Sequence, residues 1–326
     1  MEDRKLAGTR LGWVGTGRMG YSLADRLLEA GCDVAVYNRT RSKAEPLAAR
    51  GATIVASPSD LAGREIVFTM VAGSDDVKQV VLGPDGLLSG PDATPRIIVD
   101  STTVSPQASE QVRREAAERG VALLAAPVSG NPHVVAAGLL TFVVSGPRSA
   151  YAEVEPYLDL LGAGATYVGE GERARLAKIC HNLLLGVVAQ SLAEIAVLAE
   201  KGGIARADLL EFINHSVMGS MFTRYKTPAY VKLDYSPTFT PVLLRKDLDL
   251  GFELARELEV PMPVAAAARE MIQAVIARGY IEEDFAKLLD LQAEASGLQL
   301  APEDAPVTDG LGELAETVRA AAGTTR

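Results

Sequence analysis

Short apolar runs rich in β-branched residues alternate with amphipathic stretches from residue 11 to about residue 170. This alternation is typical of βαβ units, in which parallel strands are joined by crossover helices. Several runs, among them LGWV, IVFTMV and RIIV, are apolar at consecutive positions, as strands covered on both faces usually are. The pattern therefore predicts an α/β domain over residues 10–170, with a doubly wound, mostly parallel sheet and helices on both of its faces.

Only helical periodicity remains after Gly171, where apolar residues recur every three or four positions to about Leu198. This predicts one long helix of roughly 27 residues, more than twice the average length in globular proteins. Further helices are predicted around residues 206–215, 241–258 and 263–278. We expect an all-α domain over residues 171–298 that begins with the long helix, and an appended polar tail over residues 299–326.

The chain of 326 residues carries 42 acidic and 32 basic side chains, a formal net charge of −10. An acidic surface repels phosphate backbones, so nucleic acid is not an expected partner. Two cysteines and three histidines without metal-ligand spacing indicate a reduced, metal-free protein. The first ten residues lack the pattern of a secretory signal, which predicts a cytoplasmic location. The most apolar segment, residues 183–199, falls short of the ~20 residues of a bilayer span, so no membrane association is expected.

A glycine-rich segment follows the first predicted strand directly and matches G-x-G-x-x-G. The stretch after it, YSLADRLLEAG, has helical periodicity, so the motif lies between a strand and a helix, as dinucleotide-binding motifs do. The first glycine would make the tight turn, the second would let a pyrophosphate approach the backbone, and the third would let helix pack on strand. The motif therefore predicts a Rossmann fold whose cofactor contacts include Gly15, Thr16, Gly17, Arg18, Met19 and Gly20.

The second predicted strand ends in the segment Asn38-Arg39-Thr40, where an NAD-specific site usually has an acidic residue for the ribose 2′-hydroxyl. Arg39 instead offers a planar, permanently charged group that suits a 2′-phosphate, and its two neighbours offer neutral hydrogen-bonding groups. The segment favours NADP over NAD. The alternative is that Arg39 is a solvated residue at a helix start.

Two later loops also follow strands, at the carboxyl edge where ligands of open α/β folds bind. The first loop, after Asp100, has hydroxyl side chains that could contact nicotinamide or substrate, whereas Ser105, just before a proline, is expected to cap a helix. The second loop, APVSGNP, places the backbone N–H groups of Ser129, Gly130 and Asn131 in a predicted tight turn. Such a turn suits a carboxylate, although a structural loop would look much the same.

Lys178 and Asn182 are four residues apart and lie on one face of the long predicted helix. A lysine at this place could donate or accept a proton. The alternative is that its amine only extends from an apolar turn to water.

Five segments in this order resemble the β-hydroxyacid dehydrogenase family, which includes hydroxyisobutyrate dehydrogenase and the glyoxylate/succinic semialdehyde reductases. The family motif GxGxMG appears here as GTGRMG, and its D-x-S-T motif as Asp100 to Thr103 with Thr102 in place of Ser. PVSGG appears as PVSGN. K-x-x-x-N is present from Lys178 to Asn182, and a late KDL motif begins at Lys246. The resemblance covers residues 11 to about 296.

The resemblance implies a Rossmann domain followed by a helical domain that builds a homodimer or a dimer of dimers. It implies hydride transfer between NADP(H) and a small β-hydroxyacid, or its semialdehyde or oxoacid, with Lys178 as general acid/base and Asn182 orienting the lysine or the substrate. The substrate carboxylate would be held by Ser129 and Gly130. Beside the nicotinamide would lie Thr103 and Lys246.

Departures from the family pattern bear on the substrate. Asn131 replaces the second glycine of PVSGG, which changes the room beside the expected carboxylate site. In the helical domain, Arg224 or Lys226 could pair with a second anionic group of a substrate, or could be a solvated surface charge. Two other functions use this architecture, an NADP-dependent imine reductase and a non-catalytic NADP-binding interaction module. The retained Lys178 and Asn182 favour carbonyl/alcohol chemistry over both.

Overall fold

The computed structural model describes residues 8–90 and 95–323. The chain divides into two compact units, Met1–Lys178 and Ile179–Arg326. We call them the sheet unit and the helical unit.

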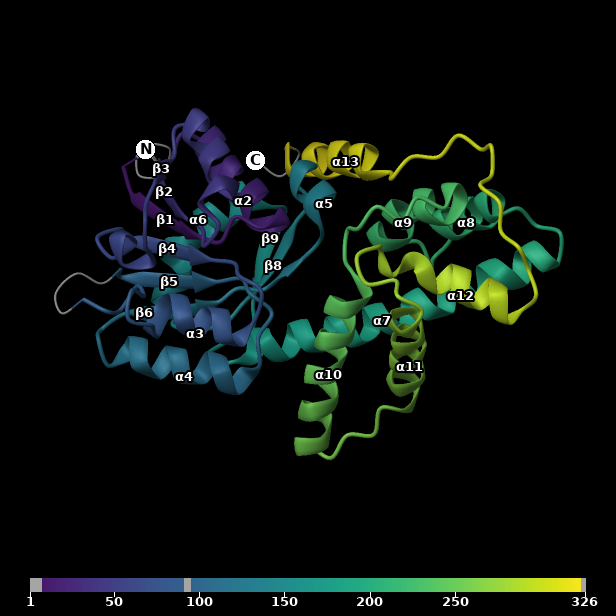
Figure 1. The fold of residues 1–326 in the computed structure, drawn as a ribbon. Helices are drawn as coiled ribbons and strands as arrows, with labels where there is room; N and C mark the ends of the chain where they lie inside the picture. Colours follow the sequence, from purple (N-terminus) through teal and green to yellow (C-terminus); the bar gives the residue numbers. More distant parts are fainter. Residues whose placement is uncertain (1–7, 91–94, 324–326) are drawn as a thin grey trace. The chain divides into compact units, whose positions relative to one another are not determined.

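The sheet unit is built on a six-stranded parallel sheet with strand order β3-β2-β1-β4-β5-β6 (Figure 1). This is the order of a Rossmann fold, in which the chain reverses its winding direction between β1 and β4. The predicted α/β class and parallel sheet are therefore confirmed. The strands are β1 (Arg10–Val14), β2 (Asp33–Tyr37), β3 (Thr53–Ile54), β4 (Ile66–Thr69), β5 (Ile97–Asp100) and β6 (Ala122–Ala125).

Helices cover both faces of this sheet because alternate side chains of each buried strand point to opposite faces. In β4, Ile66 and Phe68 belong to the core beneath α2 and α6, whereas Val67 between them belongs to the core beneath α3 and α4. Figure 1 shows α3 and α4 along one face. The covering helices are α2 (Arg18–Glu29), α3 (Ser74–Leu82), α4 (Pro106–Ala117) and α6 (Arg148–Leu161), with short 3₁₀ turns η1 (Arg41–Lys43), η2 (Glu45–Arg50) and η3 (Pro58–Leu61).

A second, three-stranded sheet follows β6 and was not predicted as a separate element. Strand β7 pairs antiparallel with β8, and β8 pairs parallel with β9. A single bridge between Ala125 and Ser145 links this sheet to the end of β6. The apolar runs of β8 and β9 therefore do not extend the large parallel sheet. The elements are β7 (Val128–Ser129), α5 (Pro132–Ala136), β8 (Thr141–Val144) and β9 (Gly164–Tyr167).

The helical unit has one apolar core, and no strand occurs among its described residues. Helix α7 begins in the sheet unit and continues into this one. The helices predicted at three places along this part of the chain are present. The elements are α7 (Arg173–Lys201), α8 (Arg206–His215), α9 (Met221–Lys232), α10 (Pro241–Glu257), α11 (Pro263–Ala277), η4 (Phe285–Lys287), α12 (Leu288–Ala295) and α13 (Leu311–Gly323).

Helix α9 was missed by the sequence analysis because Pro228 lies inside it. Proline lacks a backbone N–H and usually ends a helix. The sequence nevertheless contains an N-cap residue for α9, which was overlooked. Ser220 accepts a hydrogen bond from the backbone N–H of Thr223, as an N-cap does.

Helix α7 is 29 residues long, so the length argument against a membrane span was wrong. By length and composition the helix could cross a bilayer, and half of its most apolar window is buried inside the protein. Core helices of soluble proteins share this composition, so the helix is weak support for a membrane span.

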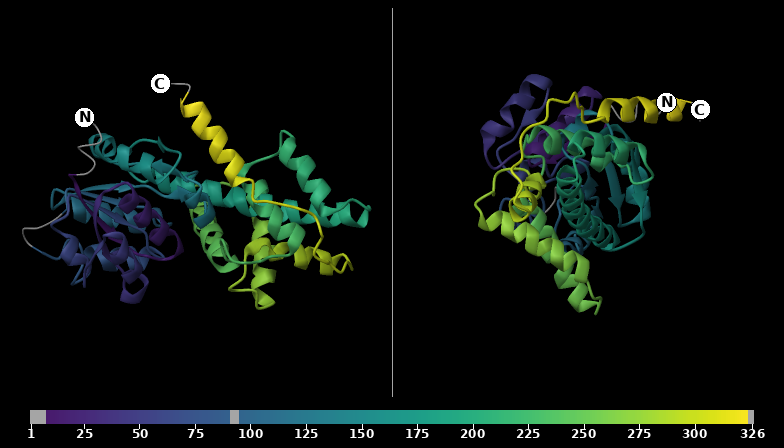
Figure 2. Two further views of the ribbon diagram at one scale, coloured as in Figure 1. Left: turned by 90° about the horizontal axis from the view of Figure 1, so that it is seen from above. Right: turned by 90° about the vertical axis from the view of Figure 1, so that its right-hand side faces the viewer.

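The segment that follows residue 298 packs on the helical unit instead of extending from it as an appended tail. Apolar side chains along it, Leu300, Ala305 and Val307, contact the helical core. The carboxylate of Glu303 accepts hydrogen bonds from the backbone N–H groups of Arg206 and Ala207 at the start of α8, at 2.7 and 2.9 Å. Figures 1 and 2 show this segment, in yellow, running along α8 and α9 before α13.

Candidate active site

The glycine-rich loop between β1 and α2 is held by the strands around it. Gly15 has φ +97°, a conformation that side chains disfavour, and a Cβ there would lie 2.2 Å from the carbonyl oxygen of Met70. Its N–H donates to the carbonyl of Tyr37, and its own carbonyl accepts from the indole N–H of Trp13 at 2.8 Å. The first glycine of the motif therefore makes the tight turn that the sequence predicts.

The other two glycines of the motif differ in what surrounds them. A Cβ on Gly20 would lie 2.0 Å from the carbonyl oxygen of Gly15, so this position must lack a side chain for helix and loop to pack. Nothing lies within 4 Å of a Cβ placed on Gly17, the N-cap of α2. The hydroxyl of Thr16 is buried and has no hydrogen-bond partner among the described residues. Open space over Gly17 and an unsatisfied hydroxyl beside it fit a bound pyrophosphate.

The segment after β2 contacts this loop directly. Asn38 accepts the backbone N–H of Thr16 at 2.9 Å through its side-chain oxygen and donates to the carbonyl of Thr40 at 2.8 Å. Arg39 is largely exposed and pairs with Asp76 of α3 at 3.1 Å. Asn38 thus fixes the loop. Arg39 remains accessible, so an anion could take the place of the Asp76 carboxylate as its partner.

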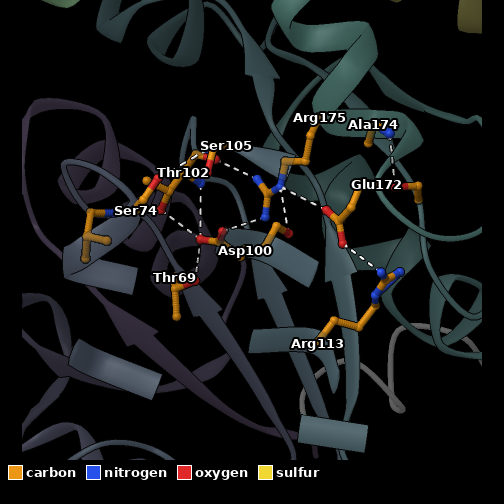
Figure 3. A network of polar contacts seen from close by, with 12 residues as sticks. Thr69, Ser74, Asp100, Thr102, Ser105, Arg113, Glu172, Ala174 and Arg175 are labelled. Carbon is orange, nitrogen blue, oxygen red and sulfur yellow. Dashed lines mark hydrogen bonds and ion pairs between the residues drawn. The ribbon is translucent and has the colours of Figure 1, made fainter. Parts of the chain in front are cut away.

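The loop after β5 is organised by a buried carboxylate. One oxygen of Asp100 accepts from the hydroxyls of Thr69 and Thr102, both at 2.7 Å (Figure 3). The hydroxyl of Thr102 also accepts the backbone N–H of Val71 at 3.1 Å. Asp100 and Thr102 are almost fully buried, whereas Thr103, the next residue, is half-buried. The hydroxyl of Thr102 therefore serves the loop, and Thr103 is the residue of this motif placed toward the surface.

Ser105 is a helix cap, as predicted. Its hydroxyl accepts the backbone N–H of Ala108 at 3.2 Å in the first turn of α4. Its own backbone N–H donates to the hydroxyl of Ser74 at the start of α3, which ties the two helix starts together.

The segment around Gly130 differs from the predicted tight turn. Ser129 belongs to the short strand β7, and Asn131 begins α5 by accepting the backbone N–H of Val134 at 3.0 Å. Gly130 has φ +143°, and a Cβ there would lie 2.7 Å from a methyl group of Leu140. Asn131 is buried, and its side-chain nitrogen has no hydrogen-bond partner among the described residues. A buried, unsatisfied amide is a candidate donor to a ligand.

Helix α7 starts beside the loop after β5. Arg175, in its first turn, donates to the second oxygen of Asp100 at 2.6 Å and to the carbonyl of Thr102 at 2.5 Å (Figure 3). Lys178 is half-buried and lies three residues further along the same helix. Arg175 was not predicted as a site residue, because it is one of two arginines in this turn and its partner Asp100 lies 75 residues earlier in the chain.

Asn182 and the late KDL motif come together in the helical unit. The side-chain nitrogen of Asn182 donates to Asp247 of α10 at 2.5 Å, and its oxygen lies 2.8 Å from a ring nitrogen of His181. The amine of Lys246 lies 3.2 Å from the other oxygen of Asp247. Because Asp247 and Asn182 are buried, this contact fixes the orientation of the Asn182 amide.

Lys226 is neither a solvated charge nor available to a substrate, contrary to both alternatives above. Its side chain is buried and pairs with Asp284 at 2.5 Å. Burial lowers the pKa of the Lys226 amine, although the neighbouring carboxylate acts in the opposite direction. Arg224 donates to the carbonyl of Asn214 at 2.6 Å.

Within residues 8–90 and 95–323, no cluster of three or more His, Cys, Asp and Glu side chains is placed to hold a metal ion. The open space over Gly17 and the unsatisfied hydroxyl of Thr16 in the glycine-rich loop fit a dinucleotide.

Known families match most of the chain. Residues 10–169 match the NAD-binding domain of 6-phosphogluconate dehydrogenase, and residues 172–292 match the NAD-binding domain of NADP-dependent 3-hydroxyisobutyrate dehydrogenase. Glyoxylate/succinic semialdehyde reductase 2, chloroplastic, of Arabidopsis thaliana is 30% identical over 88% of this chain and 80% of its own. NAD-dependent L-serine dehydrogenase of Pseudomonas aeruginosa is 31% identical over 86% of this chain and 98% of its own.

Solved structures agree with these matches. The 3-hydroxyisobutyrate dehydrogenase of Salmonella typhimurium has a TM-score of 0.78 at 26% identity, covering 87% of this chain and 99% of its own. Psf3 in complex with NADP+ and 2-OPP also has a TM-score of 0.78 at 26% identity, covering 86% and 99%. An imine reductase from Pseudomonas sp., at 22% identity and a TM-score of 0.56 over 86% and 98%, shares the fold alone.

The fold and the glycine-rich loop define a nicotinamide-dependent oxidoreductase of the Rossmann class. The chain belongs to the β-hydroxyacid dehydrogenase family.

Proposed function

We propose that this protein transfers a hydride between NADP(H) and a small β-hydroxyacid or its semialdehyde or oxoacid, with Lys178 as general acid/base. The observation that carries the proposal is the convergence of segments in the sheet unit. The glycine-rich loop, the segment 38–40 and the loop 101–103 all follow parallel strands at their carboxyl ends. Helix α7 begins at this edge through Arg175, one turn before Lys178.

The proposed chemistry needs a proton as well as a hydride. When bound, NADPH supplies the hydride that adds to the carbonyl carbon of the substrate. Lys178 donates a proton to the carbonyl oxygen, so that C=O becomes CH–OH, and it accepts that proton in the reverse direction.

The preference for NADP is assigned to Arg39. A guanidinium can bind the 2′-phosphate with two parallel hydrogen bonds, and the Asp76 that it pairs with is a surface partner that contributes little. A solved relative with NADP+ and the NADP-dependent description of the second matching family support this preference. One relative is named as NAD-dependent, so membership of the family alone does not decide the cofactor.

The substrate is assigned a carboxylate. Ser129, Gly130 and Asn131 would hold it, and the unsatisfied amide nitrogen of Asn131 supports this role. Asn182, oriented by Asp247, would orient the lysine or the substrate. Thr103 and Lys246 are assigned to the nicotinamide end of the cofactor, on the basis of the family motifs in which they occur.

A screen of NADPH consumption tests the proposal. The substrates are glyoxylate, succinic semialdehyde, tartronate semialdehyde and methylmalonate semialdehyde, with cyclic imines as the competing class. We expect turnover of at least one carboxylate-bearing carbonyl and slower turnover of every imine. Turnover of imines alone would reject the proposal in favour of an imine reductase. Binding of NADPH without turnover of any compound would favour the non-catalytic module.

We further propose a cytoplasmic homodimer or dimer of dimers that associates through the helical unit. Large apolar side chains on its surface support association, including Leu198 at 72% exposure and Phe212 at 71%. Light scattering of the purified protein tests this, and a mass of one chain at micromolar concentration would contradict it.

A further inference from the structure

The first turn of α7 carries a fully buried arginine with three hydrogen-bond partners and a longer ionic contact, 3.9 Å, to Glu172. Arg175, 1% exposed, donates to Asp100 and to the backbone carbonyl of Thr102, and its Nε donates to the hydroxyl of Ser109 in α4 at 3.2 Å (Figure 3). Every one of these partners belongs to the sheet unit. One guanidinium therefore joins α7 to the end of β5 and to α4.

Asp100 also connects Arg175 to the end of β4. Its other oxygen accepts the hydroxyls of Thr69, at the end of β4, and of Thr102. The backbone N–H of Val71 donates to the same Thr102 hydroxyl. The guanidinium of Arg175 and the carboxylate of Asp100 are thus held by several hydrogen bonds each, and such networks hold their members in a single arrangement.

A buried ion pair is a costly way to stabilise a protein. Taking both charges out of water offsets most of their attraction, and well-packed apolar residues often stabilise as much or more. A buried Arg–Asp pair therefore contributes mainly by fixing geometry. Arginine suits that task better than lysine because its planar fork binds two acceptors in fixed directions.

We propose that Arg175 is a positioning residue for the proton-transfer step. It holds the first turn of α7 against the carbonyl of Thr102, and the next peptide leads into Thr103. Lys178 lies three residues on, about 4.5 Å along the helix axis. The same guanidinium thereby sets the position of the helix that bears Lys178 relative to the loop that bears Thr103. This inference rests on the proposed function, because it acts through Lys178.

Arg175 has no direct role in binding a ligand on this account. All three of its nitrogen atoms donate to groups of the protein, and its side chain is closed off from solvent. Its effect must therefore appear in the chemical step, because the phosphate loop and the cofactor contacts at Arg39 do not depend on it.

The test is the variant Arg175→Lys, compared with Arg113→Lys as a matched control. Arg113 pairs with Glu172, just before α7, at 3.2 Å, and Glu172 also lies 3.9 Å from the Nε of Arg175. The control therefore alters the edge of the same network and leaves the contacts of Arg175 with Asp100 and Thr102 in place. For Arg175→Lys we expect kcat to fall about 10- to 100-fold, since an ångström of misplacement can cost that much. The dissociation constant of NADPH should stay within about threefold of the wild-type value.

Two further readouts separate positioning from a merely structural role. With NADPH deuterated at the transferred position, the isotope effect on kcat should rise in Arg175→Lys, because hydride transfer becomes slower than product release. The pH profile of kcat should also change. A lower melting temperature with unchanged kcat, isotope effect and pH profile would overturn the proposal, and so would an equal loss of kcat in Arg113→Lys.

If Arg175→Lys fails to fold, the double variant Arg175→Met with Asp100→Asn keeps the proposal falsifiable. It removes both buried charges together, and the amide oxygen can still accept the hydroxyls of Thr69 and Thr102. We expect this double variant to fold, to bind NADPH and to turn over slowly, and wild-type kcat in it would overturn the proposal. Full turnover in Lys178→Ala would reject the proposed function itself. An inactive Lys178→Ala together with a fully active Arg175→Lys would reject the positioning role alone.

Discussion

Each of the two units contains a buried ion pair, and the two pairs are built differently. In the sheet unit, Arg175 and Asp100 join the start of a helix to the loop after β5, which belongs to the motif Asp100 to Thr103 that the sequence marks as functional. In the helical unit, Lys226 pairs with Asp284, whose carboxylate also accepts from Thr238. The first pair uses a planar fork with several partners, and the second uses a compact ammonium.

The surroundings of the second pair indicate a role in folding. The carboxylate of Asp284 accepts the backbone N–H groups of Thr238, Phe239 and Ala286, and the ammonium of Lys226 lies 4.2 Å from the ring centre of Phe285. Of these residues only Lys226 was considered for a substrate contact, and its burial excludes that role. The comparison teaches that burial of a charge does not by itself mark a site. What distinguishes the pair in the sheet unit is the loop that it holds.

The largest effect that tests this comparison is on stability. Asp284→Asn leaves the buried Lys226 without a counter-charge, so we expect the free energy of unfolding at pH 7 to fall by about 3–5 kcal/mol. Urea unfolding followed by circular dichroism measures it. The control Asp234→Asn, at an exposed carboxylate that accepts from Ser236, should change stability by less than about 0.5 kcal/mol.

The same variant tests the role assigned to the pair. Activity per folded molecule of Asp284→Asn, measured at a low temperature, should match wild type within about twofold, because no change is expected at the site. A large loss of kcat in fully folded protein would show that the two ion pairs do not differ as described.

A second effect should appear in cofactor binding without a change in stability. Gly17→Ala adds a methyl group that meets no protein atom within 4 Å, but that would occupy the space assigned to the pyrophosphate. We expect the dissociation constant of NADPH to rise about 100-fold, the loss of one or two charge-assisted hydrogen bonds. Fluorescence titration measures it.

The matched control for this variant is Gly63→Ala, another glycine with open space around its Cβ position. It should change neither NADPH affinity nor melting temperature by a measurable amount. If Gly17→Ala bound NADPH as tightly as wild type, the pyrophosphate would not approach the backbone where we place it.

The third effect concerns cofactor preference. Arg39→Asp replaces the cation assigned to the 2′-phosphate by an acceptor for a ribose hydroxyl, so we expect the ratio of kcat/KM for NADPH to that for NADH to fall by about 10-fold or more. Arg41→Asp makes the same charge change two residues away, at a side chain paired with Glu45. It should leave the ratio within about threefold. Equal shifts in both variants would show that the preference for NADPH arises from the general surface charge and not from Arg39.

The smallest effect is on stability in acid. Burial by itself would raise the pKa of Asp284. The Lys226 ammonium and the hydrogen bonds from Thr238 and Ala286 lower this pKa by more than burial raises it, so the folded pKa lies below the ordinary 3.8. The unfolded chain then binds a proton first as the pH falls below about 4, and stability declines by at most about 1.4 kcal/mol per pH unit for this one proton. Asp284→Asn should lack this component in a pH series of urea unfolding. An identical decline in both proteins would contradict it.

Local patterns predicted the parts of this molecule that local rules govern. The parallel strands, the turn at Gly15 and the cap at Ser105 each follow from neighbouring residues. The pairing of Arg175 with Asp100 spans 75 residues, and no local pattern reports such a contact. Lys226 was misjudged for the same reason, because its partner Asp284 is 58 residues away.

Other differences have their own physical causes. Pro228 concealed α9 because proline usually ends helices, and tertiary packing outweighed that tendency. The apolar runs of β8 and β9 lie inside the predicted α/β region, but sequence alone does not say which sheet a strand joins. The short strand β7 falls in the segment that was predicted as a tight turn. Asn131 was expected to act through its backbone, a role that remains a prediction, and the cap that its side chain forms on α5 was not predicted.

The central claim is that Lys178 transfers the proton, and the variant Lys178→Ala tests it most directly. Using the best substrate of the screen, we predict a fall in kcat of about 10²- to 10⁴-fold, the usual contribution of a general acid. The dissociation constant of NADPH should remain within about threefold of wild type. Lys201→Ala, at the other end of α7 where the amine binds the carbonyl of Ser296, is the control and should retain kcat. Turnover of Lys178→Ala within threefold of wild type would contradict the account.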